Sequence, residues 1–428
     1  MEGQASAPPE AEVREPRSLL RNKHFLLLWA GQTVGELGAR ITTVVVPLVA
    51  ATTLHASAFQ IALLTSFAWL PFLFFSLPAG ILADRLDQRR LMVGCDLGRM
   101  ALMTSVPVVA AVGRLPLWYL YVVVSASGML SVLFSVAYRA RMPVVVKAHH
   151  LADGTAKLET SREFAEFTGP ALGGLLVDLV GATRAFLGNG LAYLVSAVTL
   201  WFDRTPAADG AEDGAGAPKE REPLRKEVTE GLAFIRGRRE LLAILACSAT
   251  SNFFVMAVSS LGVTFMVREL DADSWMVGLA SSISAVVGMV VGLVANRTIQ
   301  HLGTARAIRL AMAVPGPLYL LMPLAPAGWG FVLYGCGLAA FSVNAVLYNV
   351  AATSYRQRIT PEHLLGRVNA SFLWICYGVI PLGALFGGAL AAWFGLRTAL
   401  LVSVLGMWSA ALFVVFSPLR RMRDLPEE

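Results

Sequence analysis

Ionisable residues inside otherwise apolar stretches are the first feature of this sequence that could do chemistry. Glu36 lies well inside the first apolar stretch, and Arg40 follows one helical turn later on the same face. Glu159, Glu163 and Glu166 follow an i, i+4, i+7 spacing, which places three carboxylates along one face of a helix. The charge of a carboxylate depends on its burial and on nearby guanidinium groups. Such a group can therefore load a proton from one side and release it on the other.

The surroundings of these residues are those of a membrane protein. Of the 428 residues, 56% are hydrophobic and 15% are charged, whereas soluble domains carry about 25% charged residues. The mean hydropathy is +0.62. Long stretches such as 41–83 and 310–355 hold no Asp, Glu, Lys or Arg. Since a spanning helix needs about 20 apolar residues, we predict an all-α polytopic membrane protein. The composition argues against a soluble enzyme, a nucleic-acid-binding protein and a secreted disulfide-rich domain.

Inside a membrane, the carboxylates become candidates for function, because burying a charge there is costly. We interpret Glu36 and Glu166 as the main proton-coupling candidates, with Arg40 and Glu163 as their neighbours. The alternative interpretation is a static Glu36–Arg40 ion pair and a solvated carboxylate stripe. Glu159 is expected only to face the membrane interface.

The lengths of the apolar stretches predict twelve transmembrane helices. Breaks near residues 53–57 and 323–328 divide two stretches that are too long for one span each. The predicted spans are 24–51, 57–83, 91–112, 116–138, 158–180, 183–202, 241–267, 274–296, 305–325, 328–352, 366–394 and 396–417.

The distribution of basic residues predicts the orientation. If the N-terminus is cytoplasmic, the inner segments hold 29 of the 35 Lys and Arg residues. The outer loops then hold only four, which are Arg114, Arg184, Arg268 and Arg397. Cytoplasmic loops are enriched in Lys and Arg, so both termini are predicted to be cytoplasmic in a cell membrane. Residues 1–23 are polar and Pro-rich, which is not the pattern of a cleavable signal peptide.

The region between the sixth and seventh spans divides the chain in two. Residues 203–223 are rich in Ala, Gly, Pro, Asp and Glu and are predicted to form a flexible linker. Residues 224–238 have the pattern of a short amphipathic helix, which either lies on the cytoplasmic membrane surface or simply leads into the seventh span. The predicted organisation is an N-terminal tail (1–23), a six-helix bundle (24–202), this linker region (203–240), a second six-helix bundle (241–417) and a C-terminal tail (418–428).

Short motifs recur in the same order in both halves. Residues 80–85 (GILADR), after the second span, match residues 292–297 (GLVANR), after the eighth. The pair Gly173-Gly174 in the fifth span matches Gly387-Gly388 in the eleventh. Such matches indicate duplication of a six-helix unit. Two parallel repeats of this kind are typical of secondary transporters, which place the substrate between the halves near the bilayer midplane.

At this point the sequence resembles the major facilitator superfamily. The resemblance begins with the loop GILADRLDQRR after the second span, although Asp87 stands where many members carry glycine. Within the superfamily, the chain resembles the enterobactin-exporter and macrolide-efflux group, which implies the major facilitator fold and an efflux function. The motifs that carry the resemblance are residues 80–90, TGPALGG at 168–174, FLLLWAGQ at 25–32, DLGR at 96–99, GRVNA at 366–370 and PLGA at 381–384.

The resemblance also implies a gate at the cytoplasmic ends of the helices. A carboxylate at Asp84 can accept hydrogen bonds from the N-terminus of a neighbouring helix. We interpret the motif as a clasp that holds the two halves together in the outward-facing state; the alternative is a set of charges that only fixes topology. Asp96 and Arg99 share one helical face and are expected to extend this ionic network as a structural pair, with Arg139 and Arg141 as anchors. The gate candidates are Gly80, Asp84, Arg85, Arg89, Arg90, Asp96 and Arg99.

Small residues in the fifth span resemble the antiporter signature of drug exporters. They allow two helices to approach closely, and a proline inside a helix removes one backbone hydrogen bond. The functional interpretation is a leak-resistant contact, and the alternative is ordinary packing. The motif comprises Gly169, Pro170, Gly173 and Gly174.

The C-terminal half offers polar and aromatic candidates for the substrate cavity. For each of them, a buried structural hydrogen bond is the alternative. The four cysteines lie apart in apolar stretches, and neither a metal-ligand spacing nor an ATP-binding motif is present. We therefore expect no cofactor and no enzymatic activity. The cavity candidates are Asn252, Asn344, Tyr348, Asn349, Trp374 and Tyr377.

The leading functional hypothesis is a secondary active transporter that exports a small amphiphilic compound in exchange for protons. The compound would be a drug, a siderophore or another natural product, and the protein is expected to act as a monomer in the lipid bilayer. One alternative is a proton-coupled importer of a nutrient, which the antiporter-like motif disfavours. The other is a non-transporting membrane sensor or scaffold.

Overall fold

The computed structural model of the protein describes residues 23–113, 115–146, 151–203 and 224–422. In these ranges the regular elements are helices, and no strand is present. The prediction of an all-α polytopic membrane protein is therefore confirmed. Most of both predicted tails and residues 204–223 of the predicted linker lie outside the described residues.

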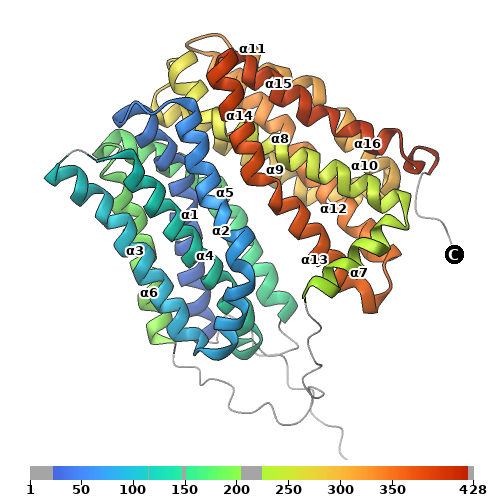
Figure 1. Ribbon diagram of the computed structural model, residues 1–428, viewed down its shortest axis with the longest axis horizontal. Helices are drawn as coiled ribbons and strands as arrows, with labels where there is room; N and C mark the ends of the chain where they lie inside the picture. The colour runs from blue at the N-terminus through green and yellow to red at the C-terminus, as the bar shows by residue number, and fades with distance from the viewer. Residues whose placement is uncertain (1–22, 114, 147–150, 204–223, 423–428) are drawn as a thin grey trace, which may run out of the picture.

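Six helices form the N-terminal half (Figure 1). Polar residues set where two of them begin: Ser57 caps α2 in a capping box with Gln60, and Asp87 caps α3 by accepting a hydrogen bond from the Arg90 backbone. The first span ends in a π-helical turn at Val49–Thr53. The helices are α1 (Lys23–Leu48), α2 (Ala58–Arg85), α3 (Gln88–Val112), α4 (Leu117–Val145), α5 (Leu151–Val180) and α6 (Ala185–Phe202).

The C-terminal half repeats this arrangement with more interruptions. The predicted ninth span, 305–325, is divided near Pro315, because proline cannot donate the helical hydrogen bond. The predicted eleventh span, 366–394, is divided at Val379, and Pro381 lies in the first turn of its second part. The helices are α7 (Leu224–Arg236), α8 (Arg239–Glu269), α9 (Ser274–Leu302), α10 (Thr304–Ala313), α11 (Leu321–Leu324), α12 (Gly330–Ile359), α13 (Glu362–Gly378), α14 (Ile380–Phe394), α15 (Leu396–Ser409) and α16 (Ala411–Val415).

Eleven helical segments of the described chain are long and apolar enough to cross a membrane. The predicted fifth span, 158–180, is not one of them. It lies within α5, which is a helix of 30 residues but carries charged side chains in its first half. The count of twelve spans therefore stays a prediction, and α5 is the helix on which it depends.

Helix α7 packs against protein. Its residue Ile235 is fully buried, and Glu230 forms an ion pair with Arg367 of α13. Gly231 lies so close to the backbone carbonyl of Arg367 that a Cβ atom would overlap it. Figure 1 shows α7 beside α13. The amphipathic pattern of residues 224–238 thus reflects, at least on this face, a contact with α13 that neither interpretation of the sequence included.

The backbone confirms the relation between the halves. His55 and Asp271 have the same unusual positive φ, 50° and 52°, in the loops that precede α2 and α9. Gly181 and Gly395 have φ values of 87° and 82° in the loops that precede α6 and α15. Each pair is separated by one repeat length, so the two six-helix units share their turns as well as their motifs.

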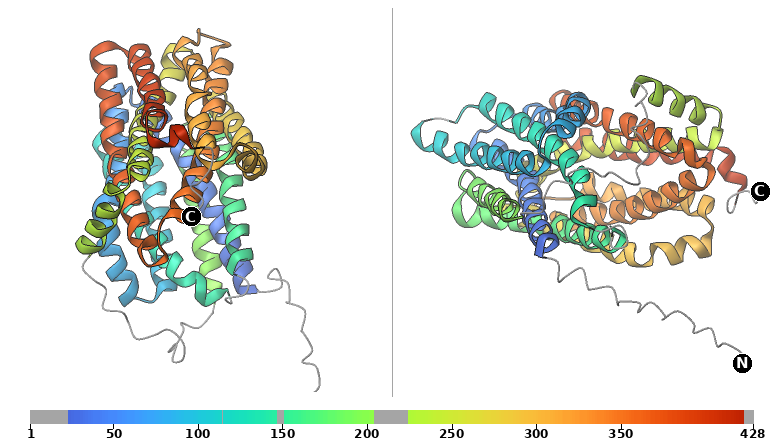
Figure 2. Two further views of the ribbon diagram at one scale, coloured as in Figure 1. Left: turned by 90° about the vertical axis from the view of Figure 1, so that its right-hand side faces the viewer. Right: turned by 90° about the horizontal axis from the view of Figure 1, so that it is seen from below.

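The two halves meet at one end and separate towards the other. Helix α5 packs along α9, and α2 packs along α14, and the views in Figures 1 and 2 show the two bundles side by side. One hydrophobic cluster joins the halves, running from Leu48 of α1 through Phe265 of α8 to Met407 of α15. Towards the end that carries α7, the halves have separate clusters, around Phe134 in one and Phe372 in the other.

Candidate transport site

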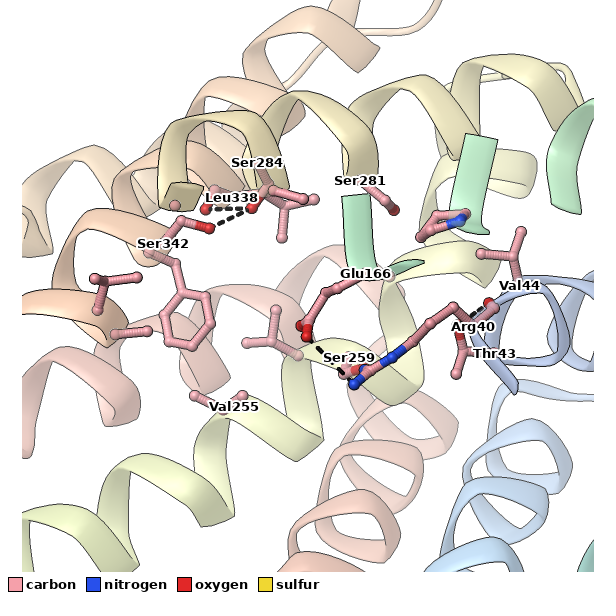
Figure 3. A pocket seen from close by; sticks show the side chains of 18 of the residues that line it. Arg40, Thr43, Val44, Glu166, Val255, Ser259, Ser281, Ser284, Leu338 and Ser342 are labelled. Carbon is pink, nitrogen blue, oxygen red and sulfur yellow. Dashed lines mark hydrogen bonds and ion pairs between the residues drawn. The ribbon is translucent and has the colours of Figure 1, made fainter. Parts of the chain in front are cut away.

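A cavity of about 760 Å³ lies between the halves. Its volume falls within the range of small-molecule sites in proteins. Helices α1 and α5 supply the wall from the N-terminal half, and α8, α9 and α12 supply most of the wall from the C-terminal half. Figure 3 shows side chains of both walls pointing into this space. The arrangement places a possible substrate between the repeats, as expected from the duplication.

An ion pair between Arg40 and Glu166 forms the polar centre of the cavity. The guanidinium nitrogen Nη2 lies 3.3 Å from the carboxylate oxygen Oε2, and the two side chains are 30% and 47% exposed (Figure 3). Gly169 makes this approach possible, because a Cβ atom there would overlap the Cβ of Arg40. The pair therefore joins α1 to α5, and Arg40 does not form the ion pair with Glu36 that the alternative interpretation of the sequence described.

The remaining carboxylates of the predicted set occupy different surroundings. Glu163 lines the cavity, together with Arg162. Glu36 is half-buried and accepts a hydrogen bond of 3.1 Å from Gln32, and it is not one of the residues that line this cavity. The side chain of Glu159 lies outside the described part of the structure. Of the two main proton-coupling candidates, only Glu166 faces the space between the halves.

Asp96 and Arg99 form a buried pair inside the N-terminal half. The Asp96 side chain is fully buried and the Arg99 side chain is 8% exposed. The Arg99 guanidinium lies between the rings of Phe134 and Tyr193, 4.5 and 4.4 Å from their centroids, an arrangement that favours a cation. The pair joins α3 to α4 and α6, and it is not placed between the two halves. This position supports the structural role that the sequence suggested for it.

The predicted gate motif is only partly described. Gly80, Asp84 and Arg85 belong to the end of α2, but their side chains are outside the described residues. Arg89 donates to the backbone carbonyl oxygens of Leu200, at 3.0 Å, and Trp201. The motif thus connects the start of α3 to the end of α6, and Asp87, which replaces the usual glycine, caps α3.

A buried aspartate that the sequence analysis assigned to the flexible linker has a structural role. Asp203 follows α6, is fully buried, and accepts a hydrogen bond of 2.6 Å from Nη2 of Arg141. His24 lies 2.8 Å from its other oxygen. These contacts join the ends of α1, α4 and α6. The available signal was an aspartate placed directly after an apolar span, with an arginine at the end of another.

The antiporter-like motif packs on two sides of α5. Gly169 and Gly173 face α1, and the Cβ that Gly173 lacks would lie 3.1 Å from the Ile41 carbonyl oxygen. Gly174 faces α9, where a Cβ atom would overlap the Ser274 backbone. In turn, a Cβ on Gly278 of α9 would lie 2.6 Å from the Pro170 carbonyl oxygen. The small residues therefore allow both the Arg40–Glu166 contact and the crossing of the halves.

Hydrogen bonds join the halves at equivalent positions of the repeat. Ser282 of α9 donates to the Phe167 carbonyl oxygen of α5 at 2.8 Å. Ser66 of α2 donates to the Pro381 carbonyl oxygen of α14 at 3.0 Å. Both serines are buried. These two serines could not be predicted from the sequence, because a single serine in an apolar helix carries no distinctive signal.

Two more bonds join the halves at the ends of these helices. Arg268 donates to the Ala56 carbonyl oxygen at 2.7 Å, and the Asp178 carboxylate accepts the Trp275 backbone N–H at 2.9 Å. Both lie in or near the loops predicted to be outside. The closed end is therefore held by polar contacts as well as by apolar packing.

The predicted cavity candidates of the C-terminal half mostly lie elsewhere. Asn349 lines the cavity. Asn344 donates to the Ala311 carbonyl oxygen at 2.8 Å, and Tyr348 donates to the Ile244 carbonyl oxygen at 3.0 Å, so both have buried structural roles. Asn252, Trp374 and Tyr377 are not among the residues that line it. The wall is instead built from hydroxyl-bearing and apolar side chains, which the sequence analysis did not single out: Ser259, Ser281, Ser284, Phe341 and Ser342.

Comparison with known proteins gives consistent results. The model of the family described as "Transmembrane secretion effector" matches residues 15–427. The chain is 27% identical to the uncharacterized MFS-type transporter YfiS of Bacillus subtilis, over 90% of this chain and 91% of the relative. It is 26% identical to the multidrug efflux pump Tap of Mycolicibacterium fortuitum, over 95% and 98%. A bacterial homolog of the human lysosomal transporter Spinster, solved inward-facing and unoccupied, shares the fold with a TM-score of 0.70 at 15% identity, over 94% and 96%.

Proposed function

Because the chain belongs to the transmembrane secretion effector family of major facilitator transporters, we propose that it exports a small amphiphilic compound in exchange for protons. The observation that carries this proposal is the Arg40–Glu166 pair in the cavity between the halves. This ion pair lies among apolar and hydroxyl-bearing lining side chains, so a substrate and a proton can both reach Glu166. The efflux activity named for the relative Tap supports the direction of transport.

The cycle follows from the contacts between the halves. In the described state, the end with the predicted outer loops is closed by the crossings of α5 with α9 and of α2 with α14. Under the predicted orientation this state is inward-facing: it takes substrate from the cytoplasm and releases protons there. Opening of the outer end would release the substrate. We propose that both termini lie in the cytoplasm and that the protein acts as a monomer.

Glu166 is the proposed proton carrier that meets the cavity. As a carboxylate it attracts Arg40, and as a neutral acid it loses most of that attraction, so protonation would free α5 from α1 at this level. Glu36 is proposed as a second carrier, since it is half-buried on α1, one turn before Arg40. In the outward-facing state these groups would load protons, and in the inward-facing state they would release them.

Efflux from proteoliposomes under an imposed pH gradient tests this proposal. The ratio of efflux with the gradient to efflux without it should fall to about one in Glu166→Gln, because a neutral amide cannot exchange a proton. Glu36→Gln should lower the ratio less. Glu269→Gln is the matched control: it removes a carboxylate near Arg397 outside the cavity and should keep the wild-type ratio. Full stimulation in the Glu36→Gln/Glu166→Gln double variant would overturn the assignment.

A further inference from the structure

We propose that a cluster of four arginines, where α7 joins α8, binds the headgroup of an anionic phospholipid. This arginine cluster consists of Arg236, Arg238, Arg239 and Arg358. In the contact at its centre, Arg238 donates a hydrogen bond to the carbonyl oxygen of Ile359, and each of the other three arginines lies within two residues of one of these partners. None of the four lines the cavity, so this surface is separate from the proposed substrate site.

The central contact of the arginine cluster is fixed by the fold. Phe234 packs against the hydrophobic cluster of the C-terminal half, and the Arg238 guanidinium lies 4.5 Å from the centroid of its ring. The Ile359 carbonyl belongs to the last turn of α12, where carbonyl groups have no partner within the helix. Arg238 donates to this carbonyl and keeps further N–H donors for a ligand. The ends of α7 and α12 are thus held together, and with them the basic residues that they carry.

The described part of the protein does not neutralise the charge of the arginine cluster. All four arginines are exposed, and no ion pair joins any of them to a carboxylate among the described residues. Glu230 of α7 pairs with Arg367 instead, and Glu240, which follows the cluster in sequence, is half-buried. Like charges that lie together repel one another, so an anion bound among these arginines would be stabilised.

The equivalent arginine in the N-terminal half has an acidic partner within the protein. Residues 138–141 (YRAR), at the end of α4, match residues 355–358 (YRQR), at the end of α12, so Arg141 corresponds to Arg358. Arg141 is 3% exposed and forms an ion pair of 2.6 Å with the buried carboxylate of Asp203, after α6. An arginine at this end of the bundle is therefore accommodated, in one half, by a carboxylate.

The C-terminal half lacks this carboxylate. At the spacing that relates Gly181 to Gly395, the residue that corresponds to Asp203 is Ser417. The Ser417 hydroxyl accepts the backbone N–H of Leu419 and caps the last described turn of the chain. The repeat thus kept the arginine and replaced its anionic partner with a neutral residue. We infer that the anion comes from outside the protein.

The position of the arginine cluster favours a lipid over a soluble anion. Helix α8 is long and apolar enough to cross a membrane, and Arg239 is its first residue. Leu242, one turn further along the helix on the same face, is 44% exposed. An exposed cation next to an exposed apolar side chain suits the border between lipid headgroups and hydrocarbon. A lipid can therefore cover Leu242 with an acyl chain while its phosphate lies among the guanidinium groups, which bind phosphate through paired N–H donors.

Titration of the purified, delipidated full-length protein with short-chain lipids tests the proposal without transport. A ligand that binds the folded protein raises its melting temperature, so the lipid concentration that gives half of the rise is measured. We expect this concentration to be about tenfold lower for phosphatidylglycerol than for phosphatidylcholine of the same chain length. The preference should shrink at high salt, because salt screens exposed charges. Soluble glycerol phosphate, which has no acyl chain, should not stabilise the protein at these concentrations.

Substitutions locate the effect. Each arginine near an anionic lipid is expected to contribute about fivefold. Arg358→Gln should therefore raise the half-saturating concentration of phosphatidylglycerol about fivefold, and Arg236→Gln/Arg239→Gln by more than about tenfold, without changing that of phosphatidylcholine. Arg236→Lys/Arg239→Lys keeps the charge and should keep most of the preference. Arg306→Gln is the matched control, because it removes an exposed arginine of α10 on the same predicted side of the membrane but outside the cluster.

Three results would overturn the proposal. Equal half-saturating concentrations for the two lipids would show that the protein has no preference for an anionic headgroup. Stabilisation by glycerol phosphate at the same concentrations would assign the arginine cluster to a soluble anion. A loss in Arg306→Gln as large as in the cluster variants would show that charge spread over the surface, rather than a site, attracts the lipid. Because these measurements do not involve transport, each outcome leaves the proposal of proton-coupled efflux unchanged.

Discussion

The two halves of this protein share a backbone but differ in where charge is buried. In the N-terminal half, Glu36, Arg40, Asp96, Arg99 and Glu166 all lie within helices that form the bundle. In the C-terminal half, residues 241–267, 274–296, 310–355 and 368–396 hold no Asp, Glu, Lys or Arg. The two halves thus share their turns and crossings, whereas the described buried charged side chains, such as Asp96 and Arg99, lie in the N-terminal half. The other copy supplies an apolar wall with hydroxyl groups.

The crossings between the halves show what both copies must keep. Gly174 of α5 packs against the backbone of α9, and Gly388 of α14 packs against α2, in equivalent places. Ser282 and Ser66 donate across the same two crossings. At each crossing a helix of one half lies close to a helix of the other half, so both halves need small residues there. The proposed proton exchange, in contrast, requires carboxylates in only one of the two halves.

Adding side chains at the crossings should have the largest effect on transport. Gly174→Val and Gly388→Val both place a branched side chain where the neighbouring helix leaves no room. The end of the protein that these crossings hold together then cannot close, and the initial rate of transport should fall more than tenfold in each variant. Gly94→Val is the control, because no atom other than those of its chain neighbours and its own helical backbone lies within 4 Å of the position its Cβ would occupy. A normal rate in either variant would show that close approach at that crossing is not required. Different rates in the two variants would show that the two crossings are not equivalent in function.

Removing one partner of the buried ion pair should have the next largest effect, on stability. Asp96→Ala leaves the Arg99 guanidinium buried without its carboxylate, which costs about 3–5 kcal/mol. Thermal unfolding in detergent should therefore begin at a clearly lower temperature. Replacing both residues, Asp96→Asn with Arg99→Met, should recover part of the loss because no unpaired charge remains. The C-terminal half has no described equivalent, so this instability is expected to start in the N-terminal half.

An unchanged melting temperature in Asp96→Ala would contradict the structural role of the pair. Transport that is lost while the melting temperature is kept would instead point to a role in coupling. Efflux and unfolding therefore have to be measured on the same preparations.

Features that depend on residues close in the sequence could be predicted, whereas features that depend on contacts between distant segments could not. Segregation of charge is a local property, and it was enough to identify a polytopic helical membrane protein. The repeat was visible because motifs such as residues 80–85 and 292–297 kept their order. The spacing of Glu163 and Glu166 predicted one shared helical face, and both residues line the cavity.

Pairing across helices was not predictable, because it depends on how the helices pack. Arg40 has a carboxylate one turn away in sequence, yet it pairs with Glu166, since Gly169 lets α5 approach α1. Asp203 was assigned to a linker by its neighbours, and only the bundle brings it to Arg141. The direction of the serine hydroxyls depends on the same tertiary detail. The sequence predicted which side chains share a face of one helix. It did not predict which side chains pair between two helices.

The smallest effect is expected when the serine hydrogen bonds at the two crossings are removed. This effect tests most directly whether the two crossings are equivalent. Ser66→Ala and Ser282→Ala each remove one hydrogen bond between the halves, worth about 1 kcal/mol, without changing the packing. Each should shift the population by a similar, severalfold factor towards the state that is open at this end, because the two bonds are equivalent. Spin labels at Thr53 and Asp273, which are exposed on opposite halves at the closed end, would report this as a growing long-distance component.

The double variant Ser66→Ala/Ser282→Ala gives the decisive measurement. If the bonds act independently on one equilibrium, the two single effects should multiply. Ser260→Ala, within one half, should leave the distance distribution unchanged. Unequal single effects would mean that opening begins at one crossing. Since only the α5–α9 crossing lies beside the Arg40–Glu166 pair, a larger effect of Ser282→Ala would link opening directly to the proposed proton carrier. Equal effects of the two single substitutions would indicate that the halves rotate as rigid bodies and that both crossings open together.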